Sequence, residues 1–176
     1  MAAHLHLVDP RADGCAWRAG VPIRVGLAEG HPAVRHCLQL LLDADEDICV
    51  VAEAADAERA AQQAHRHRAD VLVLNLPRLD RDRVAVIAHL QQVAQSRIVV
   101  MTMDSKPSLA WEALAAGVSG LVLRDRADSE LPSAIRYAAA GFEYITPRLA
   151  GVPNHRRSVR GARLRPGVRS TWLQTR

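Results

Sequence analysis

The stretch IRVGLAEGHPAVRHCLQLLL, residues 23–42, sets the pattern from which the fold is predicted. It begins with an apolar run, residues 23–28, and turns polar at Glu29 before Pro32. Apolar residues then return at helical spacing over residues 33–42. The residues predicted to share the buried face of this helix are Val34, Cys37, Leu38 and Leu41. A short run that is apolar on both faces, followed by an amphipathic helix, is typical of a parallel sheet covered on both sides.

The same unit recurs four more times along the chain. The later apolar runs are short and rich in β-branched residues, and they occupy residues 48–52, 71–74, 98–101 and 121–123. The helices predicted after them occupy residues 57–67, 84–93, 108–116 and about 129–140. Asp56 is a predicted N-cap for the first of these, and Asp128 or Ser129 for the last, which Gly141 ends. Five strands alternating with five helices predict a doubly wound α/β domain with a five-stranded parallel sheet.

The net charge of +4 divides into two parts of opposite sign. Residues 147–176 contain eight Arg and no Asp or Glu, which leaves 15 basic and 19 acidic residues, a charge of −4, for the other 146. The protein is therefore an acidic body with a basic tail. We predict a flexible extension over residues 1–21, one domain over residues 22–146, and a disordered basic tail over residues 147–176.

Cysteine spacing and hydropathy predict a soluble, cytoplasmic protein. Cys15, Cys37 and Cys49 lack zinc-ligand spacing, and we expect them to be small apolar side chains in a reducing compartment. No stretch approaches the ~18 apolar residues of a membrane span. Charged residues interrupt residues 1–21, which therefore lack the apolar core of a signal peptide.

Polar residues follow the predicted strands, where a doubly wound sheet places its functional site. The segments LAEGHPAVR at residues 27–35 and GVSGLVLRD at residues 117–125 flank this site, with Asn75 and Thr102 at the ends of the third and fourth strands. This arrangement resembles the receiver domain of bacterial response regulators, in particular the branch whose receivers precede a LuxR-type helix-turn-helix. The resemblance spans residues 23–147. It implies a flavodoxin-like (βα)5 fold and a non-enzymatic role in two-component signalling.

The resemblance also implies a known chemistry for the site. In the family, an Asp at the end of the third strand accepts a phosphoryl group, and acidic residues after the first strand help it to hold Mg²⁺. A Lys after the fifth strand contacts the phosphoryl oxygens. A Thr or Ser after the fourth strand, present here as Thr102, and an aromatic residue on the fifth, replaced here by Leu121, relay the event to the surface.

Matched position by position, most of this machinery is replaced. The phosphoacceptor position is Asn75, whose neutral amide oxygen is a far weaker nucleophile than a carboxylate. Glu29 remains from the acidic pair, but Gly30 supplies no second carboxylate, so we expect weak or no Mg²⁺ binding and no other cofactor. The lysine position is Arg124, a planar guanidinium in place of a compact ammonium, which at this altered site is able to pair with Glu29 instead.

The basic tail stands where this branch carries its DNA-binding domain. The 29 residues after Pro147 lack the length and apolar spacing of a helix-turn-helix, so we expect no recognition helix. The arginines that can still contact DNA phosphates, weakly and without sequence specificity, are Arg156, Arg157, Arg160, Arg163 and Arg165. The same composition would also arise from a GC-rich coding sequence read out of frame.

Three functions are compatible with these residues. The leading hypothesis is an atypical receiver that signals without phosphorylation through protein partners. These would bind the face of the fourth helix, fifth strand and fifth helix, residues 108–140, where Trp111 is expected to lie exposed and a homodimer is one arrangement. The second hypothesis is a LuxR-type transcriptional regulator, truncated or using its arginine tail on DNA. The third is an active phosphoacceptor at Asp80 or Asp82.

Overall fold

The computed structural model describes residues 21–150, which form a six-stranded parallel sheet, one strand more than predicted. The strands are β1 (Ile23–Ala28), β2 (Ile48–Ala54), β3 (Val71–Asn75), β4 (Arg97–Thr102), β5 (Gly120–Leu123) and β6 (Tyr144–Ile145). They lie in the order β2-β1-β3-β4-β5-β6, and each neighbouring pair is parallel. The order reverses direction between β1 and β3, which confirms the predicted doubly wound, flavodoxin-like (βα)5 fold.

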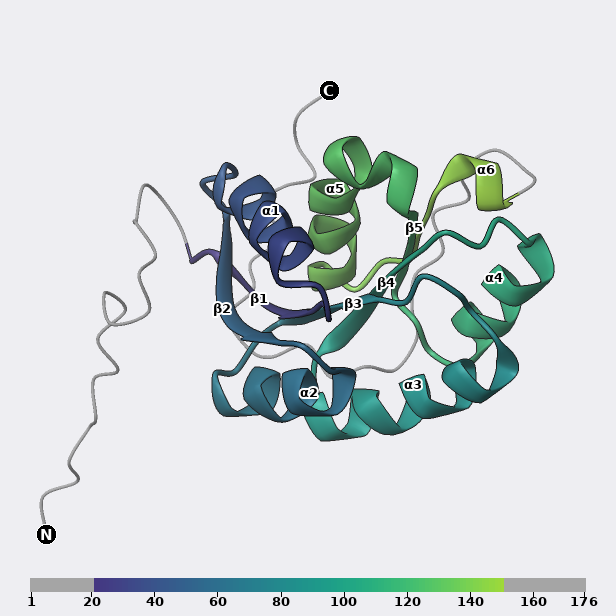
Figure 1. Cartoon of the computed structure of the whole chain (residues 1–176), viewed down its shortest axis with the longest axis horizontal. Coiled ribbons are helices and arrows are strands. Elements are labelled where there is room, and N and C mark those ends of the chain that lie inside the picture. Colours follow the sequence, from purple (N-terminus) through teal and green to yellow (C-terminus); the bar gives the residue numbers. More distant parts are fainter. Residues whose placement is uncertain (1–20, 151–176) are drawn as a thin grey trace, which may run out of the picture.

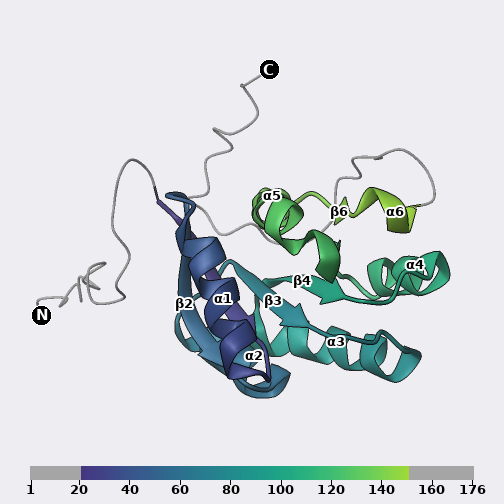
Figure 2. The same ribbon diagram turned by 45° about the horizontal axis from the view of Figure 1, so that its top comes forward.

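Helices cover both faces of the sheet. They are α1 (Pro32–Asp43), α2 (Ala57–Arg66), α3 (Arg81–Ala94), α4 (Pro107–Ala115), α5 (Ala127–Ala139) and the short α6 (Pro147–Ala150). Figures 1 and 2 show α1 and α5 on one face and α2, α3 and α4 on the other. Alternate residues of β3 serve the two layers: Val71 and Val73 pack toward α1 and α5, and Leu72 and Leu74 toward the opposite helices. This alternation explains why the strands are apolar on both faces.

The structure confirms the predicted N-cap of the second helix but not that of the last helix. Asp56 caps α2, because its carboxylate accepts a hydrogen bond from the Arg59 amide at 2.8 Å. The prediction that Asp128 or Ser129 caps the last helix is wrong. A 3-10 turn at Arg124–Arg126 runs directly into α5, so both residues lie inside the helix, and the Ser129 hydroxyl donates to a carbonyl of that turn.

The cysteines depart from the prediction at two positions. Cys37, expected on the buried face of α1, is exposed and free. The other predicted members of that face, Val34, Leu38 and Leu41, do pack in or against the core, together with Leu42. Cys49 is buried in β2 and is disulfide-bonded, so it is not a reduced thiol. Cys15 lies outside the described residues.

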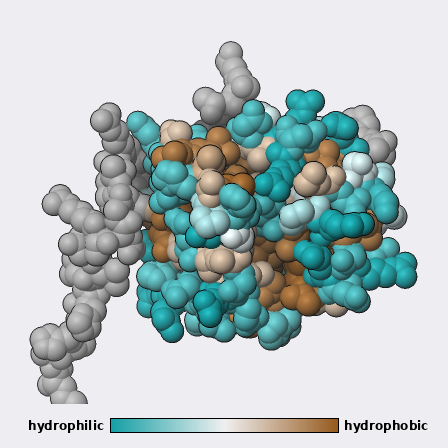
Figure 3. All heavy atoms as spheres, viewed as in Figure 1, coloured by the Kyte–Doolittle hydropathy of each residue, from teal (hydrophilic) through white to brown (hydrophobic). Residues whose placement is uncertain are grey.

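Folded structure continues beyond residue 146, where the domain was predicted to end. β6 adds to the edge of β5, and Leu149 of α6 is fully buried in the core that α2, α3 and α4 cover. The surface seen in Figure 3 is mainly hydrophilic, with apolar atoms showing between polar ones, as on most folded domains. None of the helices within residues 21–150 has the length and hydropathy needed to cross a membrane.

Candidate functional site

Four of the five site residues predicted within residues 21–150 lie at one end of the sheet, and the fifth, Leu121, lies within β5. Glu29 follows β1, Asn75 ends β3, Thr102 ends β4, and Arg124 follows β5. The strand register aligns these ends, since Asn75 stands opposite Met101 and Thr102 opposite the last residue of β5. In a doubly wound sheet, the crevice outside these carboxyl ends is where ligands bind.

Glu29 is buried, and both of its carboxylate oxygens accept hydrogen bonds. The His31 amide donates to Oε1 at 2.6 Å, and the side-chain amide of Asn75 donates to Oε2. Arg35 donates to the backbone carbonyl of Glu29 at 2.6 Å and also pairs with Glu53 at 3.4 Å. The Glu29 carboxylate is therefore held in place by neutral donors, and the nearby Arg35 forms its ion pair with Glu53 instead.

Asn75 joins this carboxylate through its nitrogen and leaves its oxygen buried without a hydrogen-bond partner. An orphaned buried carbonyl loses hydrogen bonds that water would supply, which costs about 1–3 kcal/mol. The donor set does not fit a Mg²⁺ site, because the one carboxylate present is already bonded through both oxygens and Mg²⁺ prefers several oxygen ligands in octahedral geometry. Residues 21–150 also contain no group of three potential metal-ligating side chains.

Thr102 is fully buried, and its hydroxyl oxygen accepts a hydrogen bond from the Asp104 amide at 3.1 Å. The hydroxyl thus stabilises the turn that follows β4. Leu121, at the position where the family has an aromatic residue, is also fully buried. It packs in the core toward α4 and contributes apolar contacts. Thr102 retains a hydroxyl proton that can be donated into the site, whereas Leu121 offers no polar group.

Arg124 does not make the predicted ion pair with Glu29. The carboxylate is occupied by Asn75 and the His31 amide, and among the described residues the half-buried Arg124 side chain forms no ion pair or hydrogen bond. The site thus contains two charges, the Glu29 carboxylate and the Arg124 guanidinium, that are not paired with each other. The prediction failed because it matched opposite charges and overlooked neutral donors nearer to Glu29.

The loop after Asn75 is short and tied to β4. The Leu76 amide donates to Met101 at 2.8 Å, and the Met103 amide donates to Pro77 at 3.1 Å. Asp80 then caps α3 by accepting from the Arg83 amide at 2.8 Å, and Asp82 lies exposed in the first turn of that helix. Asp80 therefore has a structural role as an N-cap, which was not predicted from the sequence.

A polar contact that was not predicted links the face of α4, β5 and α5 to the segment that follows α5. Thr146 is buried, and its hydroxyl donates to Glu130 of α5 at 2.5 Å. Burial, together with the charge and hydrogen bonding of Glu130, raises the pKa of the neighbouring Tyr144 to about 12. The only sequence signal for this contact is the short segment Tyr144 to Pro147, which follows a glycine stop. The candidate DNA contacts Arg156, Arg157, Arg160, Arg163 and Arg165 lie outside the described residues.

Comparisons with known proteins identify the fold and the family. A family model described as the response regulator receiver domain matches residues 25–136. The oxygen regulatory protein NreC of Staphylococcus carnosus (strain TM300) is 28% identical over 129 residues, which cover 72% of this chain and 59% of NreC. The probable transcriptional regulatory protein NarL of Mycobacterium tuberculosis (strain H37Rv) is 27% identical over 131 residues, 73% of this chain and 60% of NarL. A crystal structure of a LuxR-family two-component response regulator from Aurantimonas sp. SI85-9A1 has a TM-score of 0.66 at 30% identity, over 74% of this chain and 94% of that one.

These matches confirm the resemblance predicted from the strand-end residues. The chain spans about 60% of the length of the curated relatives that it matches. The matched part begins within β1 and ends within α5, and it contains Glu29, Asn75, Thr102 and Arg124. The chain belongs to the response regulator receiver domain family, and its relatives are response regulators of the NarL and LuxR type.

Proposed function

We propose that this receiver domain signals without an aspartyl phosphate, as a cytoplasmic pseudo-receiver that acts through protein partners at the face of α4, β5 and α5. The observation that carries the proposal is the hydrogen bond from the Asn75 side chain to the buried Glu29 carboxylate. Two steps lead from this contact to the proposal, one through nucleophilicity and one through charge.

The first step concerns the nucleophile. Phosphoryl transfer to a side chain at the end of β3 needs an anionic oxygen, and the amide oxygen of Asn75 is neutral. That oxygen is also buried, and its nitrogen is fixed on Glu29. An amide held in this way supplies neither the charge nor the freedom that an attacking carboxylate would have.

The second step concerns charge. Carboxylates that share a small pocket repel one another and need a cation or a proton to lie close together. Here Glu29 stands beside a neutral amide, and two N–H groups stabilise its negative charge. Both oxygens of the Glu29 carboxylate therefore have hydrogen-bond partners without Mg²⁺, and we expect the protein itself to set their arrangement.

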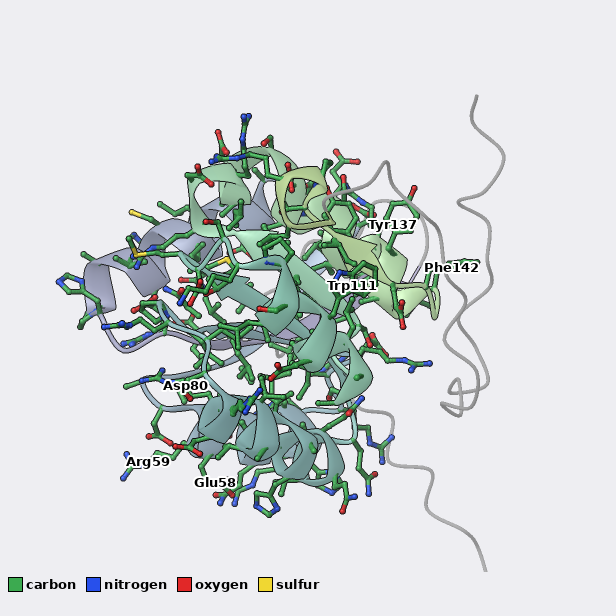
Figure 4. The ribbon with its side chains drawn as sticks, turned by 90° about the vertical axis from the view of Figure 1, so that its right-hand side faces the viewer. Glu58, Arg59, Asp80, Trp111, Tyr137 and Phe142 are labelled. Carbon is green, nitrogen blue, oxygen red and sulfur yellow. The ribbon has the colours of Figure 1, made fainter. Side chains whose placement is uncertain are left out.

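The partner surface is supported by the position of the aromatic residues. The chain has six aromatic residues, and the four within the described part all come from residue 111 onward; they are Trp111, Tyr137, Phe142 and Tyr144. Figure 4 shows Trp111, Tyr137 and Phe142 on one side of the molecule, on α4, α5 and the segment after α5. Trp111 is 45% exposed. Aromatic side chains are enriched where proteins bind one another, and this face is the best supported site for a protein partner or a second copy.

The test is incubation of the full chain with Mg²⁺ and either acetyl phosphate or beryllofluoride, monitored by amide chemical shifts and intact mass. We expect no phosphoryl adduct and no shift changes at the strand ends. Changes centred on Asn75 and Thr102 would contradict the proposal. An adduct that persists in an Asn75→Ala variant would place the acceptor at Asp80 or Asp82 instead.

A second candidate function, DNA binding by the arginine tail, is favoured by one observation, the concentration of eight Arg and no acidic residue in residues 147–176. Binding of this kind is driven by counterion release, so affinity for duplex DNA should fall steeply, by roughly 10³-fold or more between about 50 and 200 mM salt if some six phosphates are contacted. A chain ending at Ala150, which keeps the buried Leu149, should lose the binding. Affinity that persists in that shortened chain would assign the contact to the folded domain.

A further inference from the structure

The segment after α5 returns to the sheet and closes its far edge (Figure 2). We call residues 144–149 the strap; it consists of β6, Thr146 and the first part of α6. Two backbone hydrogen bonds join it to β5 and to the residue before that strand. The Tyr144 amide donates to Ser119 at 3.0 Å, and the Thr146 amide donates to Leu121 at 2.9 Å. Without the strap, β5 would be an edge strand.

Side-chain anchors hold the strap at both ends. The buried hydroxyl of Thr146 donates to Glu130 at 2.5 Å and accepts from the Leu123 amide at 3.0 Å. At the other end, Leu149 is fully buried in the core that α4 helps to cover. Arg148 adds an exposed ion pair with Asp125 at 3.0 Å. The strap is therefore fixed by a few specific contacts at two points. Its strand, β6, is only two residues long.

The strap has the features of a segment that opens separately from the core. A two-residue strand pairs with the sheet on one side only, and Tyr144 and Ile145 are half-buried rather than enclosed. Gly141, at a φ of 83°, lies just before it and reverses the chain in a conformation that favours glycine. By contrast, β3 and β4 are central strands with fully buried side chains. Segments with few buried contacts open at lower free energy than central strands.

Opening would have consequences at the site and at the partner face. The strap contacts Leu123 and Asp125, which flank Arg124 on either side. Its removal would expose backbone groups of β5, whose four residues Gly120–Leu123 are all buried and none of them charged. Unprotected apolar edges of this kind pair readily with another strand. The strap thus connects the loop that bears Arg124 to an edge on which a further strand can be added.

We propose that residues 144–149 are a displaceable strap that covers the β5 edge and opens as one unit while the rest of the sheet stays folded. The device belongs to the fold itself. It operates whether or not the pocket at Asn75 can be phosphorylated, so the two proposals stand or fall separately.

The test is native-state amide hydrogen exchange of the full chain at low urea concentrations. The amides of Tyr144, Thr146 and Leu149, and that of Leu123, should exchange at least 10-fold faster than those of β3 and β4, after correction for intrinsic rates. Their opening should depend little on urea, because a local opening exposes little surface. Strap amides that instead exchange only with the urea dependence of β3 and β4 would overturn the proposal.

Variants sharpen this measurement. Thr146→Val removes the hydroxyl from a side chain of nearly the same shape, and Leu149→Ala weakens the other anchor; each should accelerate exchange of the same strap amides by 10-fold or more. The matched control is Ser119→Ala, which removes a buried hydroxyl that has no hydrogen-bond partner, and it should change the strap rates less than 3-fold. Loss of protection throughout β3 and β4 in both strap variants would show that the strap is an integral part of the core and would overturn the proposal.

Discussion

Asn75→Asp is the change that bears most directly on how the site is balanced. The substitution keeps the size of the side chain and converts the donor that faces Glu29 into a second carboxylate. In the structure, the amide nitrogen of Asn75 is in direct hydrogen-bond contact with a carboxylate that is only 7% exposed. The variant would therefore place two negative charges side by side at a site where neither Arg35 nor Arg124 forms an ion pair with the Glu29 carboxylate.

The magnitude follows from three effects. Two unit charges about 4 Å apart at an effective dielectric constant of about 20 repel by about 4 kcal/mol. Loss of the hydrogen bond to a charged acceptor adds roughly 1.5–3 kcal/mol. Uptake of one proton by the pair limits the total, because protonating a carboxyl with a pKa near 4 at pH 7 costs about 4 kcal/mol. We expect the variant to lose about 2–4 kcal/mol of unfolding free energy at pH 7.

The assay is urea unfolding of the full chain with and without Mg²⁺, over about pH 5 to 8. Repulsion raises the pKa of the carboxyl pair in the folded variant, so the loss should be complete at high pH and should shrink as the pH falls and the pair takes up a proton. Because the variant offers a cation two carboxylates, added Mg²⁺ should restore stability to it and leave the wild type unchanged.

The matched control is Gln62→Glu. Gln62 also donates to a glutamate, Glu58, at 3.3 Å, but on the exposed surface of α2. There we expect a loss of only about 0.2–0.5 kcal/mol, as for like charges on a solvated helix. A stability of Asn75→Asp equal to wild type at pH 7 without Mg²⁺ would refute the view that the Asn75 amide balances the Glu29 charge.

Two further predictions concern ionisable groups away from the pocket. Arg136 of α5 binds both oxygens of Asp47, at 2.6 and 2.7 Å, and holds the pKa of that carboxyl below its usual range. A lowered carboxyl pKa stabilises the fold at pH values above the ordinary carboxyl pKa, and this contribution is lost as the pH falls through the lowered value. Arg136→Met should therefore lower the free energy of unfolding by about 1–3 kcal/mol at pH 7, measured by urea unfolding. The difference in stability from wild type should narrow below about pH 4. Tyr144 has its pKa raised to about 12, first by burial and then by Glu130, so its neutral phenol stabilises the strap fully below about pH 10 and this contribution is lost as the pH rises toward 12. In Glu130→Gln the pKa of Tyr144, followed by tyrosinate absorbance, should fall toward 10 without reaching it, because burial remains. An unchanged pKa would contradict the contribution assigned to Glu130.

The fold was predictable because its signals are redundant. Each unit repeats the same order of an apolar strand, a polar break and a helix, and five repetitions leave little choice of architecture. The parallel arrangement then brings Glu29, Asn75 and Thr102 to the same end of the sheet without any information on side chains. The spacing of apolar residues along the chain thus predicts the topology, and the topology predicts which strand ends lie together.

The pairing of side chains within that end was not predictable. Sequence favours Arg124 as the partner of Glu29 because the charges are opposite, but Asn75 and the His31 amide lie closer and satisfy both oxygens. β6 was missed for a related reason. Two residues carry no periodicity, and the strand exists because Thr146 and Leu149 anchor it to groups distant in the sequence.

The pocket and the strap share one physical device. In each, a neutral donor holds a carboxylate: the Asn75 amide holds Glu29, and the Thr146 hydroxyl holds Glu130. A carboxylate balanced by a diffusible cation or opposed by a phosphoryl group changes its surroundings when that ion arrives or leaves. A carboxylate held by a neutral side chain of the same chain changes them only when that side chain moves. On the two proposals made above, such contacts leave the conformation of the domain independent of Mg²⁺ and phosphate, and we expect that conformation to respond instead to a partner that competes for the strap or for the β5 edge beneath it.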